Sequence, residues 1–165
     1  MVDRNQPALS TTQSPGTAAF GARVDGVRLL LPQGESLEYF AAAAIYPLPL
    51  AGRRVRGMVQ VRGHPVVVLD PGAHGTRGDA ALSRLAVLVI GKGSEAGALR
   101  VDGPPEPLQI LDPAPPMADG GAPECSFRHA LHDAVVARAV GGSDDPAATW
   151  WRFDPRRLFE ALSGE

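Results

Sequence analysis

Residues 55–70, VRGMVQVRGHPVVVLD, are the most informative part of the sequence. In its first half, valine and glycine alternate with longer side chains, and this period of two predicts a strand with one buried face. The expected outward row is Arg56, Met58, Gln60 and Arg62. We expect Gly63-His64 to turn the chain into residues 65–69, whose continuous apolar run predicts a strand covered on both faces. The outward row is a candidate contact surface.

The residues before this stretch predict further short strands. Residues 19–24 and 27–31 are separated by Asp25-Gly26, a dipeptide typical of a two-residue hairpin turn because glycine accepts positive φ. Residues 36–43 predict another extended segment. The alanine run 41–44 in and after this segment leaves space that we expect Trp150 or Phe40 to fill.

The residues after this stretch continue the all-β pattern. Residues 82–90 and 98–101 predict a hairpin, whereas residues 103–123 form a proline-rich loop with one short extended piece at 108–111. Residues 130–140 fit either helix or strand, and we favour a strand paired with residues 149–153. Asp154 before Pro155 predicts the start of a short C-terminal helix.

Composition excludes several classes of function. The 165 residues are 44% hydrophobic, enough for one sizeable core, and the net charge of -2 argues against a nucleic-acid partner. No apolar run approaches the roughly 20 residues that span a bilayer, so we expect no direct membrane insertion. A single cysteine excludes an internal disulfide and indicates a reducing compartment.

Three groups of residues could carry chemistry. Cys125, His129, His132 and Asp133 are metal-ligand types, but no second ligand pair matches their spacing. Adjacent residues on a strand face opposite ways, so one ring of the Trp150-Trp151 pair is expected in the core. Asp70 and Asp102 each end an apolar run and are expected to be solvated. We therefore predict no catalytic residue, metal or cofactor.

Several stretches, taken in order and with their spacing, resemble the CheW-like family of chemotaxis coupling proteins. They are FGARVDGVRLLL at 20–31, Glu38, Pro47-Leu48-Pro49, VRGMVQVRG at 55–63, VVVLD at 66–70, residues 84–90 and 98–102, and WWRFDPRRL at 150–158. The first of these stretches together with the fourth is especially similar to the pilus-motility branch, the PilI type.

The resemblance implies an all-β fold of two intertwined five-stranded SH3-like barrels, with a hydrophobic groove between them and a short C-terminal helix. This domain would span residues 19–162, after a flexible tail at 1–18. It implies a non-enzymatic cytoplasmic adaptor, peripheral to receptor arrays at the inner membrane. The adaptor would link the cytoplasmic tip of a methyl-accepting chemotaxis receptor to the regulatory domain of a CheA-type histidine kinase.

The family motif places the receptor-binding surface at Arg62, with Gln60, Val61 and Gly63 beside it. We add Arg56, Met58 and Glu38 to the expected partner-binding residues. An alternative is that Arg62-Gly63 only forms a turn. A second alternative is a regulator that binds a small anionic ligand or nucleotide through Arg53, Arg54 and Arg56, because arginine guanidinium groups bind phosphate oxygens.

Overall fold

The protein is described by a computed structural model covering residues 16–72, 83–113, 122–142, 145 and 148–164. The strands are β1 Thr17–Val24, β2 Val27–Leu30, β3 Leu37–Ile45, β4 Val55–Val61, β5 His64–Leu69, β6 Ser83–Ile90, β7 Gly97–Arg100, β8 Glu106–Pro113, β9 Val135–Gly141 and β10 Thr149–Phe153. The helices are the 3-10 turn Gly93–Glu95, α1 Arg128–Ala134 and α2 Pro155–Ser163. β1 begins two residues before the predicted domain boundary, and residues 1–15 of the predicted tail lie outside the described residues.

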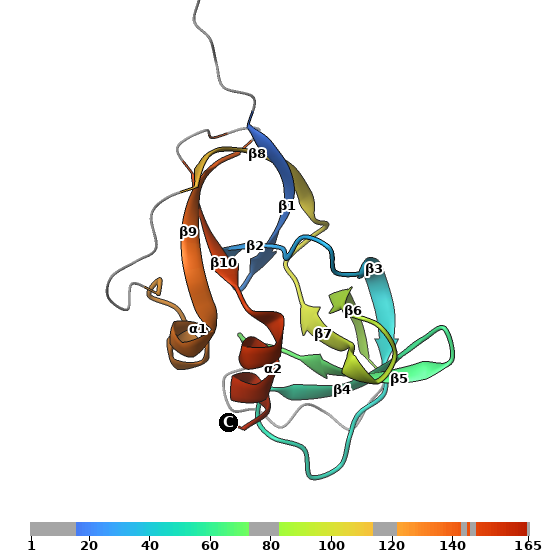
Figure 1. Ribbon diagram of the computed structural model, residues 1–165. Coiled ribbons are helices and arrows are strands. Elements are labelled where there is room, and N and C mark those ends of the chain that lie inside the picture. The colour runs from blue at the N-terminus through green and yellow to red at the C-terminus, as the bar shows by residue number, and fades with distance from the viewer. Residues whose placement is uncertain (1–15, 73–82, 114–121, 143–144, 146–147, 165) are drawn as a thin grey trace, which may run out of the picture.

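The strands form two units of five (Figure 1). One is a closed barrel in the order β1-β2-β10-β9-β8. The other, which we call the half-barrel, is a sheet in the order β3-β6-β7-β5-β4. The chain begins in the closed barrel, builds the half-barrel and then returns, so the two units are intertwined. The predicted all-β fold with two five-stranded units and a short C-terminal helix is confirmed.

The two predicted hairpins with glycine turns, β1–β2 and β4–β5, both form, but the turn of the second lies one residue earlier than predicted. Asp25 and Gly26 have φ of 48° and 77°, the positive values that a two-residue hairpin turn requires. In the second hairpin the positive values fall on Arg62 (49°) and Gly63 (84°), and Val61 pairs with His64. The prediction of a turn at Gly63-His64 was therefore one residue late, and Arg62 lies at the hairpin tip rather than in a strand row.

β5 differs from its prediction as a strand covered on both faces. Val66 and Val68 are buried in the half-barrel core, but Val67 on the opposite face is 40% exposed. Only Leu69, nearer the closed barrel, is covered on that face by the core between the two units. The apolar run alone could not reveal this, because coverage depends on where the second unit packs.

Two segments of the second half also differ from prediction. Residues 106–113 of the expected proline-rich loop form the full strand β8, which pairs with β1 and β9. Residues 128–134, which we expected to be partly strand, form α1 because Ala130, Leu131 and Ala134 share one buried helical face. The expected pairing of β9 with β10 is confirmed.

Three apolar clusters hold the fold together. One lies between the two units, one inside the half-barrel and one inside the closed barrel. Trp150 fills the closed barrel and donates a hydrogen bond from Nε1 to the Gly141 carbonyl at 2.8 Å, whereas Trp151 is half-buried, as predicted. Of the alanine run, Ala41 and Ala42 are exposed and Ala43 belongs to the half-barrel core, against which Phe40 packs. Phe40, and not Trp150 in the other unit, is therefore the large ring beside this run.

The C-terminal helix begins as the sequence predicts. The Asp154 side chain accepts hydrogen bonds from the amides of Arg156 and Arg157, and Pro155 occupies the first turn. Leu158 and Leu162 are buried in the cluster between the two units. The helix therefore closes the junction of the closed barrel with the half-barrel (Figure 1).

Candidate functional site

The predicted partner-binding residues lie on β3, β4 and the β4–β5 turn, and β3 and β4 are the two outer strands of the half-barrel sheet. The sheet nearly closes where β3 ends, because Tyr46 and Met58 exchange two backbone hydrogen bonds of 2.8 Å. This approach requires glycine at 57, where a Cβ would lie 2.2 Å from the Tyr46 carbonyl oxygen.

Glu38 and Arg62 meet across the other end of the same seam. Arg62 Nε lies 3.3 Å from Glu38 Oε2, although the two residues are far apart in sequence. The Arg62 side chain remains 81% exposed, and that of Glu38 is 34% exposed. Both residues border a hollow of about 230 Å³ at the mouth of the half-barrel.

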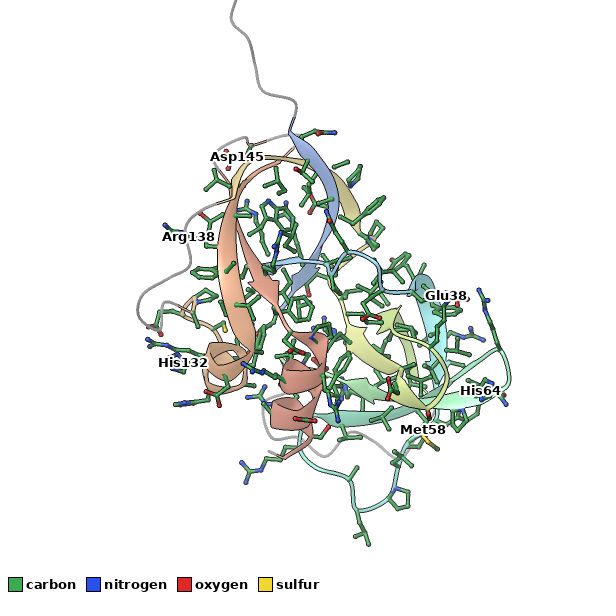
Figure 2. All side chains as sticks on the ribbon, in the orientation of Figure 1. Glu38, Met58, His64, His132, Arg138 and Asp145 are labelled. Carbon is green, nitrogen blue, oxygen red and sulfur yellow. The ribbon has the colours of Figure 1, made fainter. Side chains whose placement is uncertain are left out.

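The hollow has an apolar lining with basic residues around it. Val61, Val66 and Val89 line it, together with His64 and Lys92. Figure 2 shows Glu38, His64 and Met58 on the same half-barrel side of the molecule. His64 and Lys92 were not among the predicted site residues, because a hairpin pattern does not show that the β6–β7 loop approaches the β4–β5 turn.

The remaining predicted residues of β4 divide between its two faces. Met58 pairs with Val67 and Gln60 pairs with Pro65, so these residues lie on the outer face of the sheet. Gln60 is exposed and Met58 is half-buried. Val61 instead packs against the half-barrel core, and Gly63 completes the turn. The structure therefore places Arg62, Gln60 and Gly63 at the surface.

Arg56 does not continue the row of Met58 and Gln60. The pairing register shifts between Val55 and Gly57, which places Arg56 at an irregularity of the strand. Its Nε lies 3.0 Å from Asp70 Oδ2 as an ion pair, without the geometry of a hydrogen bond. Asp70 is 3% exposed, so the expectation that it is a solvated strand end was wrong.

The three arginines of the ligand-binding alternative do not share a site. Arg54 donates to the carbonyl of Pro71 and, at 2.8 Å, to that of Ser126. Arg56 pairs with Asp70, and Arg53 is exposed. Because two of the three guanidinium groups are held by protein acceptors, the geometry does not favour a phosphate-binding cluster.

The residues of the metal hypothesis are not brought together either. His129, His132 and Asp133 are exposed on α1, and Cys125 precedes this helix. Within the described part of the chain, no group of three or more His, Cys, Asp or Glu residues could hold a metal ion. Burial raises the pKa of the Cys125 thiol, the opposite of what a reactive thiolate needs.

A larger hollow of about 820 Å³ lies where α2 faces the half-barrel. Its lining includes Val67 of β5, Gly97 of β7 and Phe159 of α2, together with Glu35 and Glu95. The resemblance implies a groove between the two barrels, but this hollow is lined by the half-barrel, the β2–β3 connection and α2, and by no described residue of a closed-barrel strand. Its lining is mixed, since charged residues accompany the apolar ones.

Comparison with known proteins identifies the class of fold. No protein-family model matches the chain, and no curated protein matches it. Among solved structures, the chain is similar to the crystal structure of the scaffolding protein TtCheW from Thermoanaerobacter tengcongensis. The match has a TM-score of 0.54 and 17% sequence identity, and covers 88% of this chain and 93% of that chain. The protein therefore has a CheW-like fold.

None of the helices in the described residues is long and apolar enough to span a bilayer.

Proposed function

We propose that this protein is a non-enzymatic coupling adaptor of a chemosensory signalling complex. Its partners are the cytoplasmic tip of a methyl-accepting receptor and the regulatory domain of a CheA-type histidine kinase. The complex serves chemotaxis or, as the PilI-type resemblance suggests, twitching motility driven by a type IV pilus. The protein would then act in the cytoplasm, beside receptor arrays at the inner membrane.

The observation that carries this proposal is the exposed guanidinium of Arg62 on a CheW-like fold. The motif that the sequence shares with the coupling family places its receptor-binding arginine at this position. The side chain is 81% exposed at the tip of a short hairpin and lies beside the small hollow at the half-barrel mouth. An exposed arginine on a rigid turn is suited to anchor a partner, because arginine is enriched among residues that dominate binding energy.

The alternative in which Arg62 only forms the turn can be tested with one substitution. Arg62→Asn removes the guanidinium but retains the turn, because Asn-Gly is the preferred dipeptide of this hairpin type. Arg138→Ala, at an exposed position of β9 in the closed barrel, is the matched control for loss of a surface arginine.

The experiment measures co-elution of the purified protein with the kinase regulatory domain and the receptor cytoplasmic fragment from the same genome. We expect wild type and Arg138→Ala to form the ternary complex, and Arg62→Asn to lose only the receptor step. Removing a central arginine anchor reduces affinity by at least about tenfold. If Arg62→Asn binds the receptor fragment as well as wild type does, Arg62 only forms the turn. If wild type binds neither partner, the adaptor role is contradicted.

A further inference from the structure

A network of three aspartates and three arginines joins the half-barrel to the closed barrel. Its members lie in the β1–β2 turn, in β4 and just before it, directly after β5, at the end of β7, and in the connection between β7 and β8. They are Asp25, Arg54, Arg56, Asp70, Arg100 and Asp102, and Ser126 ahead of α1 connects to them. We call this set the polar junction. The proposed partner-binding surface uses only one of these residues, Arg56.

Asp70 is the buried centre of the polar junction on the half-barrel side. Arg56 Nε lies 3.0 Å from one carboxylate oxygen, and Arg100 Nη1 lies 3.8 Å from the other. The Gly72 amide donates to Oδ1 at 3.2 Å. The same Arg100 nitrogen lies 3.8 Å from Asp102, so one guanidinium connects the two carboxylates.

Asp102 connects the half-barrel to the closed barrel. Its carboxylate accepts hydrogen bonds from the backbone amides of Gly26 at 2.8 Å and Asp25 at 3.3 Å, which form the β1–β2 turn. Its own amide donates to the Arg23 carbonyl at 2.8 Å. Asp102 is exposed, as expected after the apolar run, but its carboxylate also holds the β1–β2 turn.

Ser126 makes a second connection at the same place. Its hydroxyl donates to the Asp25 carboxylate and also lies 3.2 Å from the Pro71 carbonyl, and its own carbonyl accepts from Arg54. The β1–β2 turn is thus held by side chains on two sides. These contacts cross between segments that are 55 to 101 residues apart in sequence.

The apolar cluster between the two units has a different physical character. It joins Leu29 and Phe153 of the closed barrel to Leu88 and Leu99 of the half-barrel, so it supplies the bulk of the attraction. Apolar burial is non-directional and tolerates small changes of angle. Charge-assisted hydrogen bonds have a restricted geometry, so they can favour one packing arrangement. Among the aspartates of the polar junction Asp70 is buried, whereas Asp102 is exposed.

We propose that the polar junction is an orientation lock: it fixes one relative orientation of the closed barrel and the half-barrel. This inference deepens the proposed function, because an adaptor with two partners must hold its binding surfaces at a fixed angle. Asp102 and Ser126 act here as positioning residues that hold the β1–β2 turn.

The test compares a double variant, Asp102→Ala with Ser126→Ala, with its parent. Spin labels on cysteines at His64 and Arg138, in a Cys125→Ser background, report the distance between the half-barrel and the closed barrel. Figure 2 shows these two exposed positions on opposite sides of the molecule. We expect one narrow distance distribution in the parent and a broadened or split one in the double variant.

Hydrogen exchange gives an independent readout. Loss of the Asp102 carboxylate should accelerate exchange of the Gly26 amide by at least about tenfold, the equivalent of a charge-assisted hydrogen bond. The control variant Glu124→Ala removes a carboxylate that is 83% exposed and should change neither readout. Near-ultraviolet circular dichroism of the buried Trp150 confirms that each variant is folded.

If the double variant does not fold, the two measurements are made on the single variant Asp102→Asn, because this substitution keeps the side-chain shape and removes the charge. The inference would be overturned if the folded variant that is measured had a spin-label distance distribution as narrow as that of the parent. This holds even if its Gly26 amide exchanged faster. Both measurements use the protein without partners, so the outcome does not depend on whether it binds a receptor or a kinase.

Discussion

The closed barrel and the half-barrel have five strands each, but they fill their interiors in opposite ways. The closed-barrel core is built around Trp150, whose ring occupies space left by Gly21. The buried core of the half-barrel consists of valine, alanine and isoleucine side chains, and Glu38 and Arg62 pair across the open end of its seam. One unit thus depends on a single large side chain, and the other on many small ones.

The two units are therefore expected to tolerate substitutions at different places. A barrel that is closed and filled by one ring has no free edge, so it suits a structural role. The half-barrel leaves charged and polar side chains at its mouth and on its outer face, where a partner can reach them.

The largest effect is expected at the centre of the closed barrel. Trp150→Ala should lower the free energy of unfolding by about 3–5 kcal/mol, because the cavity left behind adds to the lost burial. Chemical denaturation followed by far-ultraviolet circular dichroism measures this. Trp151→Ala, which removes the half-buried ring of the next residue, should lower the free energy of unfolding by clearly less. Equal costs would mean that the closed barrel does not depend on Trp150.

Alanine substitutions at two glycines should affect the two units differently. A Cβ at Gly21 would lie 2.2 Å from the Trp150 ring and 2.7 Å from Leu108 Cδ1, so Gly21→Ala should cost about 1–3 kcal/mol of unfolding free energy. A Cβ at Gly97 would lie 2.5 Å from the Phe159 ring, which borders the larger hollow and can move into it. Gly97→Ala should therefore lower the free energy of unfolding by less than Gly21→Ala does. Thermal denaturation of both variants measures this difference.

The arginines before and within β4 give a prediction for the half-barrel. Arg56→Ala leaves the buried Asp70 with the Gly72 amide and one more distant cation, Arg100, and should lower the free energy of unfolding by about 1–3 kcal/mol. Arg53→Ala changes an exposed side chain and should stay within about 0.5 kcal/mol. Urea denaturation measures both. If both variants changed the free energy of unfolding by a similarly small amount, Arg56 would not stabilise the buried Asp70.

The smallest effect concerns Cys125, which packs against the cluster between the two units. Burial raises the pKa of its thiol in the folded protein. Alkylation by iodoacetamide, which requires the thiolate, should therefore need a higher pH in the folded protein than in urea. By linkage, stability should fall slightly as pH rises from the unfolded-state pKa through the raised folded-state pKa. Identical alkylation profiles would contradict this burial effect.

Much of the fold could be predicted because its signals are local. The Asp25-Gly26 turn follows from the φ values that glycine permits, and the start of α2 follows from the capping chemistry of Asp154 before Pro155. The period of two identified the buried face of β4 at Val59. α1 was missed because its apolar residues merge with the valines that begin β9.

The candidate site was predictable only in part. The sequence motif pointed to Arg62, Gln60 and Gly63, and these residues lie at the surface of the half-barrel. It could not show that Glu38 lies within ion-pair distance of Arg62, or that Lys92 and His64 line the same hollow. These contacts join strands and loops that pairing brings together from distant parts of the chain.

Local sequence patterns specify the strands, the glycine turns and the capped C-terminal helix, because backbone preferences and side-chain periodicity act over a few residues. Tertiary packing, in contrast, buries Asp70 between two arginines, separates Arg53, Arg54 and Arg56, and leaves Val67 exposed. The physical reason is that burial and charge pairing depend on which distant segments pack together. The two units of this protein meet through contacts that no local pattern records.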